Sequence, residues 1–274
     1  VTDENTASTF CPYCRNTAIL KSKLSNEFRP AYIIPFKTEK KDAIKAFESV
    51  LKGKPLAPRE FKSDSEIESI KGIYIPFWLY DLVSDGALTC ECHKTRTWMS
   101  GNYQHTETKI YNVIREGNIT YNKIPVDGSS HFDNDVMNSI EPFDYKELTK
   151  YNHAYLAGFL AEKYDQKGEE TLKDAKERAN NSTKNIFLSD MSGYSSRIEK
   201  SQKFDAKTLS EDYALLPVWM LNVIYKGKAY TFAMNGQTGK FIGDVPIDKK
   251  RAWLYRIIIF IIVFAIVMLA DRKS

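Results

Sequence analysis

Cysteine and histidine are scarce in this sequence, with four of each among 274 residues. The cysteines form two close pairs, Cys11 with Cys14 and Cys90 with Cys92, instead of the dispersed even set of a secreted disulfide scaffold. This usage favours a reducing compartment. No histidine belongs to an H-E-x-x-H motif or to a pair four residues apart, so the sequence carries no metallohydrolase signature.

Motifs for phosphate binding and nucleophilic catalysis are also missing. The nearest approach to the loop G-x-x-x-x-G-K-[ST], at residues 236–241, has the wrong spacing and no hydroxyl after its lysine. Residues 127–131 (DGSSH) combine nucleophile and base types without a G-x-S-x-G elbow, so we expect a polar turn, with a hydrolytic site as the alternative. Residues 133–135 begin like a calcium loop, but Asn138 replaces the required glycine and Asp144 the bidentate glutamate. We therefore predict no catalytic residue and no enzyme.

Net charge is low, because 39 Lys and Arg are offset by 35 Asp and Glu, which leaves +4. These charges are distributed along the whole chain, whereas a dedicated DNA-binding protein concentrates cations on one face. Hydrophobic residues make up 43% of the sequence, and the length is sufficient for a real core. The composition indicates a globular protein and gives little support to nucleic acid as a partner.

One long apolar run stands at residues 252–270, where Arg256 is the only charge. A helix of that length reaches about 28 Å, close to the roughly 30 Å of a hydrocarbon core. Lys249, Lys250 and Arg251 precede the run, and fewer cations follow it, which by the positive-inside rule places the large domain in the cytoplasm. The run thus predicts one transmembrane helix, the lipid bilayer as a partner and a cell-membrane localisation. A buried core helix is the alternative.

The pair Cys11 and Cys14, in the sequence CPYC, has the two-residue spacing of a zinc knuckle. We predict structural Zn²⁺ at these two cysteines within a partial zinc ribbon over residues 1–28. Because the chain starts at Val1, we expect the second ligand pair upstream. Cys90 and Cys92 are an alternative source of ligands, but their one-residue spacing is more typical of buried structural cysteines. A thioredoxin-like redox role for CPYC is a further alternative, although no strand precedes it.

The residues between the ribbon and the apolar run, 29–248, show mixed helix and strand patterns. A strand over residues 31–37 precedes a helix that Thr38 caps and Gly53 ends. Alternating residues 88–126 predict a hairpin with its turn at Glu116 and Gly117. Residues 133–190 read as helical, with one helix near residues 156–160 and a longer one marked by the apolar residues Leu172, Ala175, Ala179 and Ile186.

A strand meander follows over residues 213–245, with turns at residues 226–227 and 235–236. The predicted fold class is therefore α+β, with antiparallel sheet units flanking a helical insertion. An N-terminal partial zinc ribbon and a C-terminal transmembrane helix complete this expected architecture.

Three apolar segments are each built around one proline: residues 32–36 (YIIPF), 74–78 (YIPFW) and 215–219 (LLPVW). Proline cannot donate to a sheet ladder, so each segment belongs at a sheet edge, a bulge or a strand start. The recurrence indicates a duplicated strand unit, although the helices between the segments do not match. Trp78 and Trp219 are expected in the core instead of serving as ligand-stacking platforms.

A family resemblance covers nearly the whole chain. It rests on the ordered blocks CPYC, YIIPF, GIYIPFW, IPVDGSS, EPFDY, ALLPVWMLN and YTFAMNGQTGKFIGDVP. Together they resemble a family of zinc-ribbon (TFIIB-type zinc finger-like) membrane proteins of Firmicutes, often labelled primosomal replication-restart helicases. The resemblance implies a further cysteine pair ahead of Cys11 and hydrophobic segments at the end of the chain. The missing phosphate loop gives the helicase label no support.

The expected function is that of a membrane-anchored zinc-ribbon scaffold or adaptor, a non-catalytic binding module with a protein partner. Two alternatives stay open: an enzyme whose site is assembled from residues distant in sequence, and a nucleic-acid-binding accessory of replication or transcription. A broad apolar or aromatic patch would favour the adaptor. A deep polar pocket with perturbed pKa values would favour the enzyme.

Overall fold

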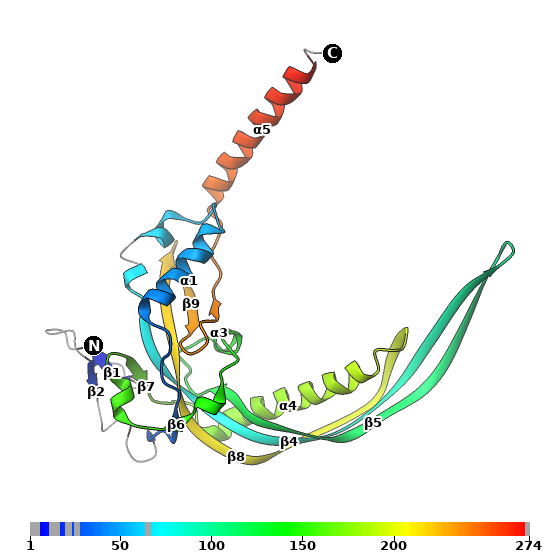
Figure 1. Cartoon of the computed structure of the whole chain (residues 1–274), viewed down its shortest axis with the longest axis horizontal. Coiled ribbons are helices and arrows are strands. Elements are labelled where there is room, and N and C mark those ends of the chain that lie inside the picture. Colours follow the sequence, from blue (N-terminus) through cyan, green and yellow to red (C-terminus); the bar gives the residue numbers. More distant parts are fainter. Residues whose placement is uncertain (1–5, 11–16, 20–23, 25–27, 64–66, 272–274) are drawn as a thin grey trace.

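The computed structural model describes residues 6–10, 17–19, 24, 28–63 and 67–271, and its strands form one ten-stranded sheet (Figure 1). The strand order is β10-β9-β8-β4-β7-β1-β2, with β5 beside β4 and β3 joining β8 to β6. The strands are β1 (Thr6–Phe10), β2 (Thr17–Ile19), β3 (Tyr32–Ile33), β4 (Lys71–Ser100), β5 (Tyr103–Asp127), β6 (Thr149–Lys150), β7 (Leu160–Glu162), β8 (Ser196–Tyr225), β9 (Lys228–Asn235) and β10 (Phe241–Ile242). The helices are α1 (Lys40–Lys52), α3 (Asn134–Ser139), α4 (Gly168–Asp190) and α5 (Lys249–Asp271), with 3-10 turns at Arg59–Lys62, Tyr145–Glu147 and His153–Leu156.

Three long strands dominate the sheet. β4 and β8 have 30 residues each and β5 has 25. β4 lies between the other two, pairing with β8 from Lys71 to His93 and with β5 from Phe77 to Ser100. Beyond His93, β8 no longer accompanies the hairpin, and β4 and β5 continue as a two-stranded projection. We call residues 94–109 the arm; it extends far from the body and turns at Gly101, where φ is +61° (Figure 1).

Helix α1 forms where the sequence predicts it. Its buried face is Ala43, Phe47 and Leu51, and Gly53 follows its last turn. Glu39 precedes the first turn and donates its backbone N–H to Asp42 Oδ2 over 2.9 Å, so the predicted cap is wrong by one residue. This helix packs its aromatic residue into the core cluster on one side of the sheet.

The residue expected to cap α1, Thr38, instead ties two distant parts of the chain together. Its hydroxyl donates to the Gly236 carbonyl over 2.9 Å and accepts from the Trp219 indole N–H over 2.9 Å. Trp219 is buried, as predicted. Trp78 is half-buried, and its indole donates to the Gln166 carbonyl over 2.9 Å. Both indoles pack against other aromatic rings, Trp78 against Tyr164 and Tyr213 and Trp219 against Phe36 and Phe159, which supports a packing role.

Helix α4 runs along the concave side of the long strands and contacts β4, β5 and β8 (Figure 1). Its buried positions recur about every four residues and are mostly small: Gly168, Thr171, Ala175, Ala179, Thr183 and Phe187. Small residues bring the helix close to the sheet, so polar groups meet across the contact. The Tyr80 hydroxyl lies 2.7 Å from Thr171 Oγ1, and the Tyr121 hydroxyl lies 2.9 Å from Thr183 Oγ1. Of the expected apolar stripe, Ile186 is exposed.

The predicted α+β class, with sheet units on either side of a helical insertion, is wrong. One continuous sheet runs through the described residues, and α4 lies against it. The expected turn at Glu116 and Gly117 lies inside β5, where Gly117 faces Gly86 of β4 and pairing continues on both sides. The expected helix near residues 156–160 is a 3-10 turn followed by strand β7. The Lys226–Gly227 and Asn235–Gly236 turns of the meander are confirmed.

The separate zinc ribbon of the predicted fold is also wrong. Strands β1 and β2 pair with each other, and β1 pairs with β7, so both belong to the common sheet. Over the described ranges, no group of three or more His, Cys, Asp or Glu residues is placed to hold a metal ion. The predicted Zn²⁺ ligands Cys11 and Cys14 lie outside those ranges.

The predicted transmembrane helix over residues 252–270 is contradicted as well. Within the described part of the chain, no helix combines the length and the apolar character needed to cross a bilayer. The first turns of α5 contain Lys249, Lys250, Arg251 and Arg256. The uninterrupted apolar run that follows, residues 257–270, reaches only about 21 Å against roughly 30 Å of hydrocarbon. The cell-membrane localisation and orientation drawn from that helix fall with it.

The sheet contains an internal repeat centred on the pairing of Ile75 in β4 with Leu216 in β8. One unit is β3-α1-β4-β5 and the other is β7-α4-β8-β9. The units interlock, because β3 runs parallel to β8 of the other unit and β7 runs parallel to β4 of the first. Residues 74–78 and 215–219 are thus equivalent, as the prolines indicated. Residues 32–36 correspond instead to residues 160–164, at the start of the second unit.

The same joint recurs at both ends of this repeat. The Gly128 N–H donates to the Pro76 carbonyl over 2.9 Å, and the Gly236 N–H donates to the Pro217 carbonyl over 2.8 Å. The Gly128 carbonyl accepts from the two residues ahead of the α4 cap, and the Gly236 carbonyl from the two ahead of the α1 cap. Each proline therefore stands where its neighbouring strand ends, so its missing N–H costs no ladder bond.

Adding a methyl group at the two equivalent glycines should have unequal effects. A Cβ at Gly236 would lie 2.6 Å from the Phe36 ring and 2.8 Å from Pro217, whereas a Cβ at Gly128 would lie 3.2 Å from Tyr164 and 3.3 Å from Trp78. We expect Gly236→Ala to lower the free energy of unfolding by about 1–3 kcal/mol. Gly128→Ala should cost clearly less. Urea denaturation of the two variants measures the difference, and equal losses would contradict the assigned packing.

Candidate functional site

Exposed apolar side chains gather in two described elements, helix α5, where Trp253 and Phe260 are 65% and 69% exposed, and the arm. Near its tip, Trp98, Met99 and Tyr103 are 41%, 66% and 75% exposed. Beyond the end of β8 no described element covers either face of this hairpin (Figure 1). A two-stranded ribbon buries little of its own apolar surface and is marginally stable alone. These three side chains therefore lie on the surface and belong to no hydrophobic core cluster.

Cations accompany the aromatic tip of the arm. The Arg96 guanidinium lies 5.6 Å from the Trp98 ring, whose other neighbour is the His105 imidazole at 5.4 Å between ring centroids. Lys94 and Lys109 add two further cations to the arm, and Glu107 is its one carboxylate. Tryptophan, tyrosine and arginine are the residue types that contribute most binding energy at protein interfaces.

The arm belongs to only one copy of the internal repeat. In the second unit the hairpin begins at the pair Val218–Asn235 and closes at Lys226–Gly227. In the first unit it begins at the equivalent pair Phe77–Asp127 and closes only at residues 101–102. The packing of the repeat does not require this extra length, since the shorter hairpin completes the same joint.

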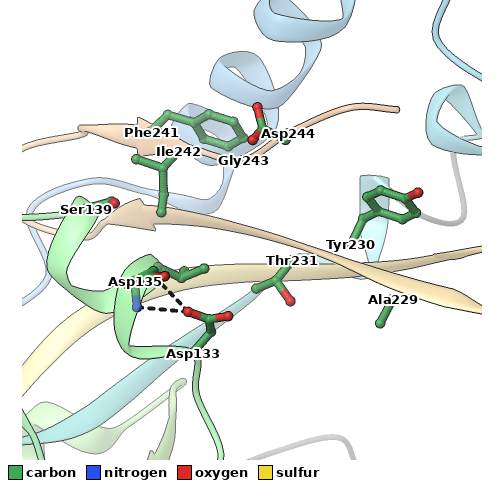
Figure 2. A pocket seen from close by; sticks show the side chains of 11 residues that line it. Asp133, Asp135, Ser139, Ala229, Tyr230, Thr231, Phe241, Ile242, Gly243 and Asp244 are labelled. Atoms are coloured by element: carbon green, nitrogen blue, oxygen red, sulfur yellow. Dashed lines mark hydrogen bonds between the residues drawn. The ribbon is translucent and has the colours of Figure 1, made fainter. Parts of the chain in front are cut away.

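A second surface feature is a groove between α3, β9 and β10 (Figure 2). Its volume is about 620 Å³. Its lining residues are Asp133, Asp135, Val136, Ser139, Ala229, Tyr230, Thr231, Phe241, Ile242, Gly243 and Asp244. Three aspartates and no Lys or Arg stand in this lining, while Val136 and Ile242 belong to the edge of the core. The groove is therefore acidic at its rim and apolar at its floor.

The residues that resembled a calcium loop form one wall of this groove. Asp133 Oδ1 accepts from the Asp135 N–H over 2.8 Å and from the Val136 N–H over 3.3 Å, which caps α3 (Figure 2). A capping role uses the carboxylate in the way that helix N-termini favour. The calcium hypothesis, already weakened by Asn138 and Asp144, finds no support in this arrangement.

A buried acidic group lies at the first of the two repeat joints. Asp127 is 4% exposed; its Oδ1 accepts from the Ser129 N–H over 3.0 Å, and its Oδ2 has no hydrogen-bond partner among the described residues. Burial, opposed by the Ser129 hydrogen bond and assisted by the carboxylates of Asp165 and Glu162, raises the pKa of Asp127 to about 7. At the equivalent position the chain has Asn235, whose amide donates to two carbonyls.

The neighbouring Ser129 and His131 do not form a hydrolytic triad. Glu162 Oε2 accepts from the Ser129 hydroxyl over 3.4 Å and lies 3.5 Å from His131 Nδ1, so the carboxylate stands between the other two groups. A triad needs the imidazole in that position. Ser130 donates to Asp165 from both its N–H and its hydroxyl, over 2.8 and 2.6 Å. These contacts support the polar turn expected for residues 127–131.

Cys90 and Cys92 are both buried and free, in the cluster under the end of α4. Burial raises the pKa of the Cys90 thiol, which keeps it protonated at neutral pH. The interpretation of these residues as structural cysteines is confirmed.

Comparison with known proteins gives a clear relationship. The chain is 40% identical over 238 residues to "Uncharacterized protein YdjG" of Bacillus subtilis (strain 168), an alignment that covers 86% of this chain and 70% of that protein. The chain belongs to the YdjG family. No family model matches the sequence, and no solved structure matches it. The name of YdjG specifies no ligand or partner, so function is inferred from the surfaces of this YdjG-family chain.

The sequence of the YdjG-family chain alone does not indicate several residues of these sites. Glu162 and Asp165 approach Asp127 only because β7 folds beside β4. Asp244 reaches the groove after β10, far in sequence from Asp133. The tip residue Tyr103 had a local signal, since Gly101 and Asn102 suit a two-residue hairpin turn.

Proposed function

We propose that this YdjG-family chain is a non-catalytic adaptor that binds a protein partner through its arm. The observation that carries the proposal is the exposure of Trp98 and Tyr103 on one face of the arm and of Met99 on the other, on a hairpin that projects beyond every described element of the body. Exposed apolar patches of this kind mark interaction sites, because their hydration is unfavourable and their burial against a partner removes that cost.

The charges of the arm define the partner surface that it fits. Lys94, Arg96 and Lys109 flank the apolar tip, and one carboxylate, Glu107, opposes them. A complementary surface has an apolar pocket for Trp98 and an acidic rim. Such a rim would speed association and select the partner more than it would add affinity.

Site-specific photo-crosslinking in cells tests the adaptor function. A photoreactive phenylalanine analogue would replace Tyr103 on the arm and, as a matched control, the equally exposed Ile224 on the body, which is 74% exposed. We expect one protein partner, identified by mass spectrometry, to be crosslinked from position 103 and not from position 224. In a Trp98→Ala/Met99→Ala background the crosslinked product should fall about tenfold or more, as for loss of interface anchor residues.

Controls separate loss of binding from loss of folding. The double alanine variant should keep the thermal midpoint of the native protein within a few degrees, since Trp98 and Met99 are exposed and lie outside the core clusters. Equal crosslinking from both positions would overturn the proposal. So would products formed only with lipid, and products formed only with a second copy of the chain would replace the adaptor with self-association.

A further inference from the structure

We infer that the groove between α3, β9 and β10 binds an extended peptide segment that bears lysine or arginine, and that this segment adds as a strand to the open edge of β9. The site is distinct from the arm. Its residues come from the opposite end of the body, and none of them belongs to residues 94–109.

The first argument is the open strand edge. On one side β9 pairs with β8 along its full length, from Lys228 to Asn235. On the other side β10 pairs only with Met234 and Ala233. In the described structure no strand pairs with the outer edge of residues 229–231, and these residues line the groove. An exposed edge offers backbone N–H and C=O groups that an added strand can satisfy.

The second argument is the shape of the groove. At about 3.3 Å per residue, residues 229–231 offer an edge of roughly 10 Å, enough for about three residues of an added strand. Helix α3 forms one wall of that space and supplies Val136, while β10 supplies Ile242 (Figure 2). In an added strand every second side chain would face this apolar floor, and the others would face the rim.

The third argument is charge. Asp133, Asp135 and Asp244 are exposed at the rim, and no Lys or Arg stands among the lining residues. Asp133 is fixed by its capping bonds, so one negative charge is held in place before a ligand arrives. Three aspartates on two walls suit cationic side chains spaced along a strand. Over the described residues these acids do not form a group placed to hold a metal ion, which favours an extended ligand with several separated charges.

The test uses three fluorescent, end-blocked octapeptides and the full chain. The first peptide alternates lysine and valine, the second alternates glutamate and valine, and the third is the first with its two central valines replaced by proline. We expect measurable binding, by fluorescence anisotropy, of the first peptide only. Glutamate reverses the charge complementarity, and proline removes N–H groups that a sheet ladder requires.

Two variants and one matched control localise the binding. Asp133→Asn/Asp135→Asn/Asp244→Asn removes the rim charges while asparagine preserves the α3 cap, and the affinity should fall about tenfold or more for three lost surface pairs. Ala229→Lys places a cation in the groove and should weaken binding similarly. The control Asp174→Asn/Glu177→Gln/Asp205→Asn makes the same change in net charge at exposed positions outside the groove, and should stay within about twofold of the native affinity.

Amide hydrogen exchange distinguishes strand addition from binding by charge attraction alone. Binding of the lysine–valine peptide should slow amide exchange within residues 229–231, because an added strand protects outward-facing N–H groups. Equal binding of all three peptides, equal weakening by the two triple variants, or binding with no added protection at these amides would each overturn the inference. The Trp98→Ala/Met99→Ala variant should bind the peptide normally, so failure of the groove and failure of the arm are distinguishable.

Discussion

Replacing Asp127 with asparagine is expected to stabilise the protein at pH 8 by about 2–4 kcal/mol and to change its stability little at pH 4. The reason is the position of the carboxyl, which is buried with Oδ2 unpartnered and has its pKa raised to about 7. An asparagine keeps an acceptor for the Ser129 N–H. Its amide N–H groups would also face Glu162 and Asp165 with favourable electrostatics.

The sign of the effect follows from proton binding. The unfolded carboxyl titrates near its ordinary value of 3.8, whereas the folded one titrates near 7. Between these values the folded state holds a proton that the unfolded state has lost, so the free energy of unfolding decreases as pH rises. Below this window both states are protonated, and above it the full cost of a buried charge is present. The asparagine variant lacks this dependence.

Urea denaturation of the native protein and the variant at pH 4, 6 and 8 measures the predicted difference. The gap between them should open from about pH 4 upward and become constant above about pH 7. An Asp165→Asn variant is a useful comparison, because burial alone would raise the pKa of Asp165, but the hydrogen bonds from Ser130 and the nearby His131 together outweigh burial and lower it. That variant should lose stability where the other gains it. A pH-independent gap for Asp127→Asn would contradict the assigned environment.

The reverse change at the equivalent joint, Asn235→Asp, should be strongly destabilising, by about 3–5 kcal/mol at pH 8. The fully buried Asn235 amide donates to the Ile140 carbonyl over 3.0 Å and to the Pro142 carbonyl over 3.2 Å. A carboxylate there would lose both hydrogen bonds and place its charge against two carbonyl oxygens. Its Oδ1 would still accept from the Gln237 N–H, so the turn itself is preserved.

Urea denaturation at pH 4, 6 and 8 also tests the Asn235→Asp variant. Stability should partly recover at low pH, because a protonated carboxyl can donate to one of the two carbonyls. An Asn235→Ala variant separates the loss of hydrogen bonds from the added charge, and it should be less damaging than aspartate at pH 8 and independent of pH. If aspartate and alanine were equally damaging at pH 8, the charge argument would be wrong.

The extent to which sequence predicted this fold depends on the range of the contacts involved. Helix α1 and the β8-β9-β10 meander follow from local signals, namely the period of Ala43, Phe47 and Leu51 and the turn residues Lys226 and Gly227. The single sheet does not, because it depends on the pairing of β4 with β8, whose residues are far apart in sequence. Glu116 and Gly117 resembled a turn, since a glycine inside a long strand and a glycine in a hairpin give the same local pattern.

The candidate surfaces follow the same division. Buried roles for Cys90, Cys92 and Trp219 were predictable from residue type and spacing, and all three are confirmed. The groove was not predictable, because its aspartates come from two segments that meet only through the sheet. The sequence DGSSH indicates a polar turn at Asp127 but not its raised pKa, because the carboxylates of Glu162 and Asp165 that contribute to it come from β7 and the residues after it.

The central pairing of β4 with β8 also constrains the order in which the chain can acquire its structure during synthesis. Ser100 meets Tyr103 across a two-residue turn, so the long hairpin can zip from its tip as soon as it leaves the ribosome. Lys71 can pair only after Met220 has been synthesised, and until then one edge of β4 is unpaired and can pair with other chains. Slow translation between residues 128 and 195 would prolong that exposure, and a chaperone that shields the waiting edge would be expected to raise the yield of folded protein.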